Sequence, residues 1–124
     1  MLNDSKVTAN VPAADLDRAR NFYADKLGLV ASAENPGGLI YKTSGGTTFF
    51  LYQTEYAGQA GHTIAQFHVD DVEEQVRDLT AKGVKFEHYD MPDTKLEGDL
   101  HVMGDMKVAW FKDPDGNILN LING

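Results

Sequence analysis

Few residues of this chain have the type and spacing that catalysis or metal binding requires. Asp113 and Asp115 lie in an Asp-Pro-Asp-Gly turn, but the other oxygen ligands of a calcium loop do not follow them. The chain has no cysteine, which excludes disulfides, thiolate metal sites and a cysteine nucleophile. Its serines lie in no nucleophile-elbow pattern, and its paired glycines at 37–38 and 45–46 precede no predicted helix. The remaining candidates are histidine, amide and aromatic side chains on predicted strands.

The net charge and composition of the chain limit the classes of partner that it can bind. The net charge is −8, from 11 basic and 19 acidic residues, which argues against nucleic acid because phosphate binding needs clustered Lys and Arg. This charge is compatible with a cationic ligand, but solubility is the simpler explanation and the one we favour. No apolar run approaches the length of a membrane span, and residues 1–6 are too polar for a signal peptide. We therefore expect a cytoplasmic protein with no membrane or nucleic-acid partner.

The first half of the chain predicts one strand, one helix and three further strands. Residues 6–11 alternate between apolar and polar side chains, which indicates a strand, and Pro12 is expected to end it. Asp15 is a typical helix N-cap, and Gly28 follows the helical pattern where a left-handed residue is expected. The further strands are expected at residues 29–33, 39–43 and 47–53.

The second half repeats this order. Residues 63–69 alternate, Asp71 and Glu74 resemble a capping box, and Gly83 ends the predicted helix. Further strands are expected at residues 84–89, 106–112 and 117–122, with a polar loop over about 90–105 that is either a functional lid or a mobile surface loop. The repeat predicts an α+β fold of two βαβββ units, 1–54 and 63–124, joined by a connector over 55–62 in a single domain.

Each predicted unit has one helix on the outer face of a small mixed sheet, so the other face is left open. The open face carries the side chains of the parity opposite to the apolar one, and their mixture of polar and aromatic groups suits a small-molecule cleft. Trp110 opposes Phe111 in parity and is expected to face this cleft. A wetted face or a dimer surface is the alternative. The predicted ligand-binding residues are Thr8, Asn10, Phe50, Tyr52, Gln66, His68, Trp110 and Asn120.

Two segments resemble a known family. They are Asp15–Tyr23 followed by Leu27-Gly28, and Phe111–Leu119 with its Asp-Pro-Asp-Gly turn. Together with the paired βαβββ units of about this length, these segments resemble those of the vicinal oxygen chelate superfamily. This superfamily includes glyoxalase I, bleomycin resistance proteins and extradiol dioxygenases. The resemblance covers nearly the whole chain and implies the βαβββ fold. It also implies a homodimer, because the superfamily commonly pairs these sheets.

The resemblance argues against the usual metal centre. Metal-dependent members of the superfamily take His, Gln or Glu ligands from the first and last strands of both units. The matching positions here are Lys6, Phe50, Ile64 and Asn120. Because Phe and Ile carry no ligand atom, we expect no metal and no cofactor. A displaced metal site formed by Glu55, His62 and His68 is the alternative.

The predicted function is metal-independent binding of a small molecule, with sequestration of a cationic or aromatic compound. The alternative is an enzyme of the same superfamily (a lyase, isomerase or dioxygenase) that uses a displaced metal or acid–base chemistry of His68. In a third interpretation the open face is only a dimer surface.

Overall fold

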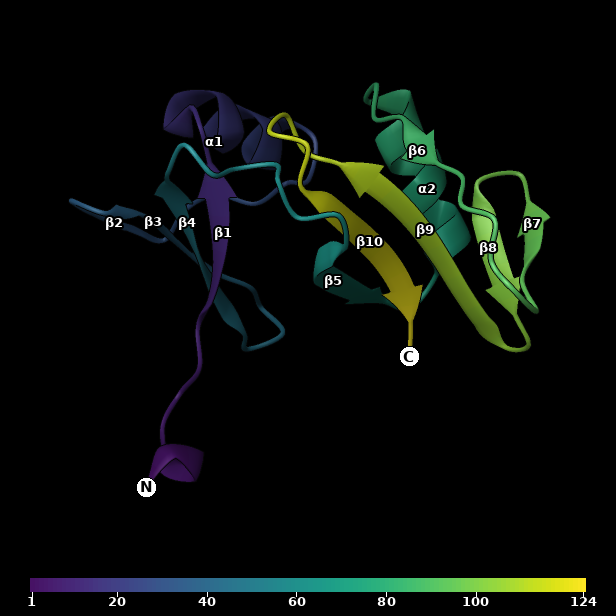
Figure 1. Cartoon of the computed structure of the whole chain (residues 1–124), viewed down its shortest axis with the longest axis horizontal. Coiled ribbons are helices and arrows are strands. Elements are labelled where there is room, and N and C mark those ends of the chain that lie inside the picture. Colours follow the sequence, from purple (N-terminus) through teal and green to yellow (C-terminus); the bar gives the residue numbers. More distant parts are fainter.

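The computed structural model describes all 124 residues and contains two β-sheets, each with one helix against it (Figure 1). The first sheet has the strand order β1-β4-β3-β2, with β1 parallel to β4 and the other neighbours antiparallel. We call this sheet and its helix the four-stranded unit. Its elements are β1 (Ala9–Ala13), α1 (Leu16–Asp25), β2 (Ala33–Asn35), β3 (Gly38–Lys42) and β4 (Thr48–Gln53).

The second sheet begins in the same way, with a strand and then a helix. Its strand order is β5-β10-β9-β8-β7, with β5 parallel to β10 and β6 paired beside β8 along β9. We call it, with its helix, the six-stranded unit. Its elements are β5 (Thr63–Val69), α2 (Val72–Ala81), β6 (Phe86–Glu87), β7 (Lys95–Glu97), β8 (Leu100–Met103), β9 (Met106–Lys112) and β10 (Ile118–Asn123). The predicted α+β fold class is confirmed.

Both helices begin and end as their local sequence requires. The Asp15 side chain accepts a hydrogen bond from the backbone N–H of Arg18 at 3.1 Å, and Asp71 accepts one from Glu74 at 3.0 Å. These bonds satisfy N–H groups that have no partner within the helix. Gly83 has a φ of +90°, a conformation in which an L side chain would be strained.

Several predicted strand boundaries are wrong. β1 starts at Ala9 rather than residue 6 and continues through Pro12, which is tolerated because β1 pairs only with β4 and is an edge strand. The strand expected at 29–33 is replaced by β2, and only Phe86 and Glu87 of the stretch 84–89 form a strand. The polar loop expected over 90–105 contains β7 and β8.

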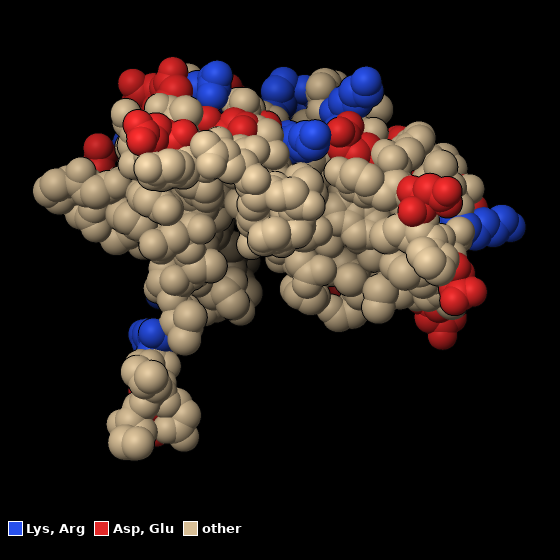
Figure 2. All heavy atoms as spheres, viewed as in Figure 1, with Lys and Arg blue, Asp and Glu red and all other residues tan.

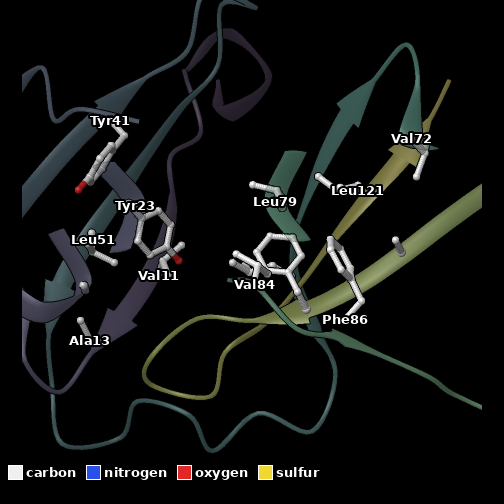
Figure 3. Close-up of a cluster of buried hydrophobic side chains, with 14 of the residues drawn as sticks. Val11, Ala13, Tyr23, Tyr41, Leu51, Val72, Leu79, Val84, Phe86 and Leu121 are labelled. Atoms are coloured by element: carbon white, nitrogen blue, oxygen red, sulfur yellow. The ribbon is translucent and has the colours of Figure 1, made fainter. Parts of the chain in front are cut away.

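One hydrophobic core cluster of 16 buried residues extends through both units. In Figure 3, Tyr23 and Leu51 gather in the four-stranded unit, while Leu79 and Phe86 gather in the six-stranded unit. Residues 1–8 lie outside this core and project from the molecule as an arm that carries a short 3-10 helix, Leu2–Asp4 (Figure 1). No helix is long and apolar enough to cross a membrane.

The turn between β9 and β10 joins the two units. Asp113 Oδ2 accepts a hydrogen bond from the Tyr23 hydroxyl at 2.8 Å, and Asn117 Nδ2 donates to the carbonyl of Pro12 at 2.7 Å. Asp115 Oδ1 accepts from the Ala14 N–H at 2.8 Å and from the Arg18 guanidinium at 2.9 Å. These carboxylates are therefore structural acceptors between the units.

Candidate functional site

The predicted ligand-binding residues fall into three separate places. Gln66 and His68 line a pocket between the two units. The other residues lie outside this pocket, in two groups. On the four-stranded unit are Thr8, Asn10, Phe50 and Tyr52, and on the six-stranded unit are Trp110 and Asn120.

The pocket between the units, which we call the seam pocket, has a volume of about 340 Å³. Its walls come from β1 and β4 on one side and from β5 on the other, with Tyr23 and Leu119 contributing from α1 and β10. No Asp, Glu, Lys or Arg lines it. Figure 2 shows the charged side chains gathered mainly over the helices, while the surface beside the hollow between the units is largely uncharged. The polar lining residues are Thr43, Thr47, Thr48, Gln66 and His68.

His68 and Gln66 supply polar atoms at the exposed side of the seam pocket. His68 Nδ1 lies 2.9 Å from the backbone carbonyl of Gly124, which leaves Nε2 for a ligand. No Asp or Glu side chain contacts His68, so the Gly124 carbonyl is the group that orients its ring. The Gln66 side chain makes no hydrogen bond within the protein and can both donate and accept.

The open face of the four-stranded sheet is an aromatic surface outside the seam pocket. Phe50 pairs across the sheet with Asn10, and its ring stacks on that of Tyr52 with centroids 6.2 Å apart. Thr8 precedes β1 and is exposed. The seam pocket instead uses Phe49 and Tyr23, from the helix-covered side, because it lies along the free edges of β1 and β5. Strand parity alone does not reveal an edge pocket of this kind.

Trp110 and Asn120 pair with each other on neighbouring strands of the six-stranded sheet. The Trp110 indole N–H donates to Thr63 Oγ1 on β5 at 2.9 Å, so the indole crosses over β10. Asn120 is 1% exposed. The ring of His101, a residue outside the predicted set, lies 4.8 Å from Trp110, and His101 Nε2 accepts the backbone N–H of Tyr89 at 2.9 Å. Gly98-Asp99, a typical two-residue hairpin turn, is the sequence signal that places His101 on a strand.

The residues present do not fit a metal centre. At the positions that match the ligands of metal-dependent relatives, Phe50 and Ile64 carry no donor atom, and Lys6 lies on the exposed arm. The displaced set of Glu55, His62 and His68 does not converge, because no three His, Cys, Asp or Glu side chains of the chain lie close enough to hold an ion.

Burial changes the acidity of two groups at the turn that joins the units. Burial raises the pKa of Asp113, and the hydrogen bonds from Asn117 and Tyr23 only partly offset this effect. Burial, together with the charge of Asp113, raises the pKa of Tyr23 above its ordinary value. Both groups stabilise the junction of the two units through their hydrogen bond.

Solved structures of similar fold include proteins of different activities. A bleomycin-binding protein in complex with bleomycin is 22% identical, with 97% of this chain and 98% of that chain covered and a TM-score of 0.71. A lactoylglutathione lyase from Agrobacterium tumefaciens is 20% identical over 97% of this chain and 93% of that chain, with a TM-score of 0.69. A fosfomycin resistance protein from Listeria monocytogenes is 14% identical over 97% of this chain and 93% of that chain, with a TM-score of 0.71. These similarities show the fold alone.

Comparison with curated protein sequences finds no match. The sequence model of one family does match, and it matches residues 7–121, nearly the whole chain. This chain belongs to the Glyoxalase/Bleomycin resistance protein/Dioxygenase superfamily.

Proposed function

We propose that this protein binds a small, uncharged aromatic molecule in the seam pocket without a metal ion. The observation that carries the proposal is a pocket of about 340 Å³ that has aromatic walls and two free polar groups, in a chain whose metal-ligand positions hold Phe50 and Ile64. Pockets of this size suit small organic ligands, with apolar walls for affinity and a few polar groups for orientation. Phe49 and Phe67 would pack against the ligand, and Gln66 and His68 Nε2 would orient it.

The uncharged lining of the seam pocket favours a neutral ligand over a cationic one. The acidic residues that give the chain its charge of −8 do not line the seam pocket. A cation placed there would lose hydration without gaining an ionic partner. Sequestration, as opposed to turnover, is supported by the lack of an Asp or Glu partner for His68 and by the existence of a bleomycin-binding protein of the same fold.

Two probes that differ only in charge test this function. We expect 2-naphthylmethanol to bind with a measurable heat in calorimetry and the matched 2-naphthylmethylammonium ion to bind at least about tenfold more weakly. Binding should persist in protein dialysed against EDTA. Equal binding of the two probes, or loss of binding after EDTA treatment, would contradict the proposal.

A mutation that fills part of the seam pocket tests whether the ligand binds there. Ala9 is exposed and lines the seam pocket, so Ala9→Leu should narrow the pocket without disturbing the core and should weaken naphthylmethanol binding by about tenfold or more. Ala81→Leu, on the exposed end of α2, is the control and should bind as the parent does. Unchanged binding by Ala9→Leu would place the ligand elsewhere.

We further propose a homodimer with a cytoplasmic location. Support for the dimer comes from the arm, where Leu2 is 87% and Val7 is 88% exposed although both are apolar. Light scattering should give twice the chain mass for the full chain and a lower mass when residues 1–8 are removed. Fractionation of cells that make the full chain tests the location.

A further inference from the structure

Three buried polar atoms in and beside the six-stranded sheet have no hydrogen-bond partner. They are His101 Nδ1, the Tyr89 hydroxyl and Asn120 Oδ1. His101 is 0% exposed and Asn120 is 1% exposed, so bulk water does not satisfy them. Buried polar atoms are nearly always paired, and leaving one unpaired is destabilising. A group of three on one side of a small sheet indicates a partner that is not part of the chain.

The three residues surround one side chain, Trp110. Its ring centroid lies 4.8 Å from that of His101 and 5.5 Å from that of Tyr89, both in edge-to-face geometry. Asn120 is its cross-strand neighbour on β10. Trp110 is held over β10 by a single side-chain hydrogen bond, to Thr63 at 2.9 Å. The unpaired atoms therefore border a single aromatic surface.

The hydrogen bonds present define what the missing partner must offer. His101 Nε2 accepts the N–H of Tyr89, so the ring proton of the neutral histidine is on Nδ1, which becomes a donor. The Tyr89 hydroxyl can donate or accept, and Asn120 Oδ1 accepts. The partner must supply at least one acceptor atom, to meet His101.

A pocket of about 320 Å³ adjoins this cluster, lined by residues that include Tyr89 and Leu96. Tyr89 belongs to the cluster itself, and Leu96 is the cross-strand neighbour of His101. The lining residues of this pocket lie between residues 88 and 96, in the stretch from β6 to β8 that Figure 1 shows at the end of the molecule away from β1. Asp90 lines this pocket. Asp99 Oδ1 lies 2.7 Å from Nε2 of another lining residue, His88. The negative charge of these carboxylates disfavours binding of an anion.

We propose that this cluster and the adjoining pocket form a second binding site, for a neutral planar ligand with a carbonyl or ring-nitrogen acceptor. The ligand ring packs against Tyr89 and Trp110, and its acceptor takes the hydrogen bond from His101 Nδ1. Tyr89 lines the pocket, and its ring centroid lies 6.2 Å from that of His101, so the Tyr89 ring turns aside to admit the ligand. The pocket beside the cluster shares no lining residue with the seam pocket, although Asn120 pairs across the sheet with Gln66. The existence of this second site does not depend on the function proposed for the seam pocket.

Three small probes test the chemistry on the full chain. Benzamide supplies a neutral ring with an acceptor, benzoate adds a negative charge, and ethylbenzene lacks the acceptor. In nuclear magnetic resonance titrations, benzamide should shift the indole signal of Trp110, the only tryptophan, and the His101 ring signals with saturation. Benzoate and ethylbenzene should bind at least about tenfold more weakly. Equal affinities for the three probes, or shifts that map only to the seam pocket, would overturn the proposal.

Variants separate a ligand site from a buried water. His101→Phe keeps an aromatic ring beside Trp110, removes the donor and should weaken benzamide binding about tenfold, while His62→Phe, on the exposed connector, should not. Tyr89→Phe and Asn120→Leu decide the matter if His101→Phe does not fold, and each should weaken binding at least about threefold. The proposal would be overturned if benzamide bound these variants as it binds the parent chain. It would also be overturned if a long-lived water were found at His101 and the Trp110 and His101 signals did not respond to benzamide, because the cluster would then hold an ordered water only.

Discussion

Tyr23 and Asp113 show how one hydrogen bond couples distant parts of the chain to pH. Their 2.8 Å bond joins α1 to the turn between β9 and β10, and Tyr23 is 1% exposed. The bond satisfies the Tyr23 hydroxyl, which burial would otherwise leave unpaired, and Asp113 Oδ2 also accepts from Asn117 Nδ2 at 2.9 Å. Burial and the Asp113 charge both oppose ionisation of the phenol, so the folded state keeps a proton that the unfolded state releases in alkali.

We therefore predict a loss of stability at high pH that depends on Tyr23. The unfolded pKa of tyrosine is about 10, and the folded pKa is higher, so the stabilising contribution is complete below about pH 10 and declines as pH rises above it. The decline for one such proton is at most about 1.4 kcal/mol per pH unit. Urea unfolding between pH 7 and pH 11 should show a shallower decline in Tyr23→Phe than in the parent chain.

The same variant should also be less stable at pH 7. Removing the hydroxyl leaves Asp113 without one of its donors, at a cost of about 1–3 kcal/mol. Tyr56→Phe is the matched control, because Tyr56 is 66% exposed, and it should follow the parent chain at every pH. Parallel pH profiles for the parent and Tyr23→Phe would show that the buried phenol is not the source of the alkaline sensitivity.

Elements differ in how far the local sequence determines them. Both helices were predicted with their caps, because Asp15 and Asp71 act on amides only three residues away. Strand boundaries were predicted less well, because pairing depends on remote neighbours. Pro12 was expected to end β1, yet it is accommodated because one side of that strand is free. β7 and β8 were missed, and His101 with them, although the Gly98-Asp99 and Gly104-Asp105 turns were local signals.

The capping argument yields a matched pair of mutations in α2. Asp71→Ala removes the acceptor for the Glu74 N–H and should lower the free energy of unfolding by about 1 kcal/mol. Asp70→Ala, one residue earlier, removes an exposed carboxylate that makes no hydrogen bond and should change stability by less than about 0.5 kcal/mol. Chemical denaturation of both variants measures the difference, and similar losses in the two would mean that charge, rather than capping, is responsible.

At the scale of the whole molecule, the candidate site could be predicted only in part. Strand parity correctly placed Gln66 and His68 on an exposed side of β5, and both line the seam pocket. It did not indicate Tyr23 or Phe49, because the pocket forms where the edges of two units approach, and that approach is set by contacts distant in sequence. The turn at Asp113–Asn117 supplies many of those contacts.

Asn117 gives a prediction about how the two units hold together. Its side chain donates to Pro12 and Asp113 and accepts from the Gly58 N–H at 3.3 Å, so Asn117→Ala should cost about 1–3 kcal/mol. Hydrogen exchange at Gly58 and in β1 should accelerate. Asn123→Ala also removes two side-chain bonds to backbone, but within the six-stranded unit, and should leave exchange in β1 unchanged. Equal acceleration of hydrogen exchange in β1 by both variants would contradict a specific junction at Asn117.

The place of this turn in the chain has a consequence for biosynthesis. The four-stranded unit is complete in sequence by Gln53, yet Tyr23 and the backbone of Pro12 and Ala14 find their partners only in residues 113–117. The nascent chain must therefore carry its first sheet without these protein partners until residues 113–117 have been translated. Contacts of such long sequence separation slow folding. A chain that lacks residues 113–117 would keep its first half exposed to proteases and chaperones, so translation of this turn acts as the checkpoint for a closed fold.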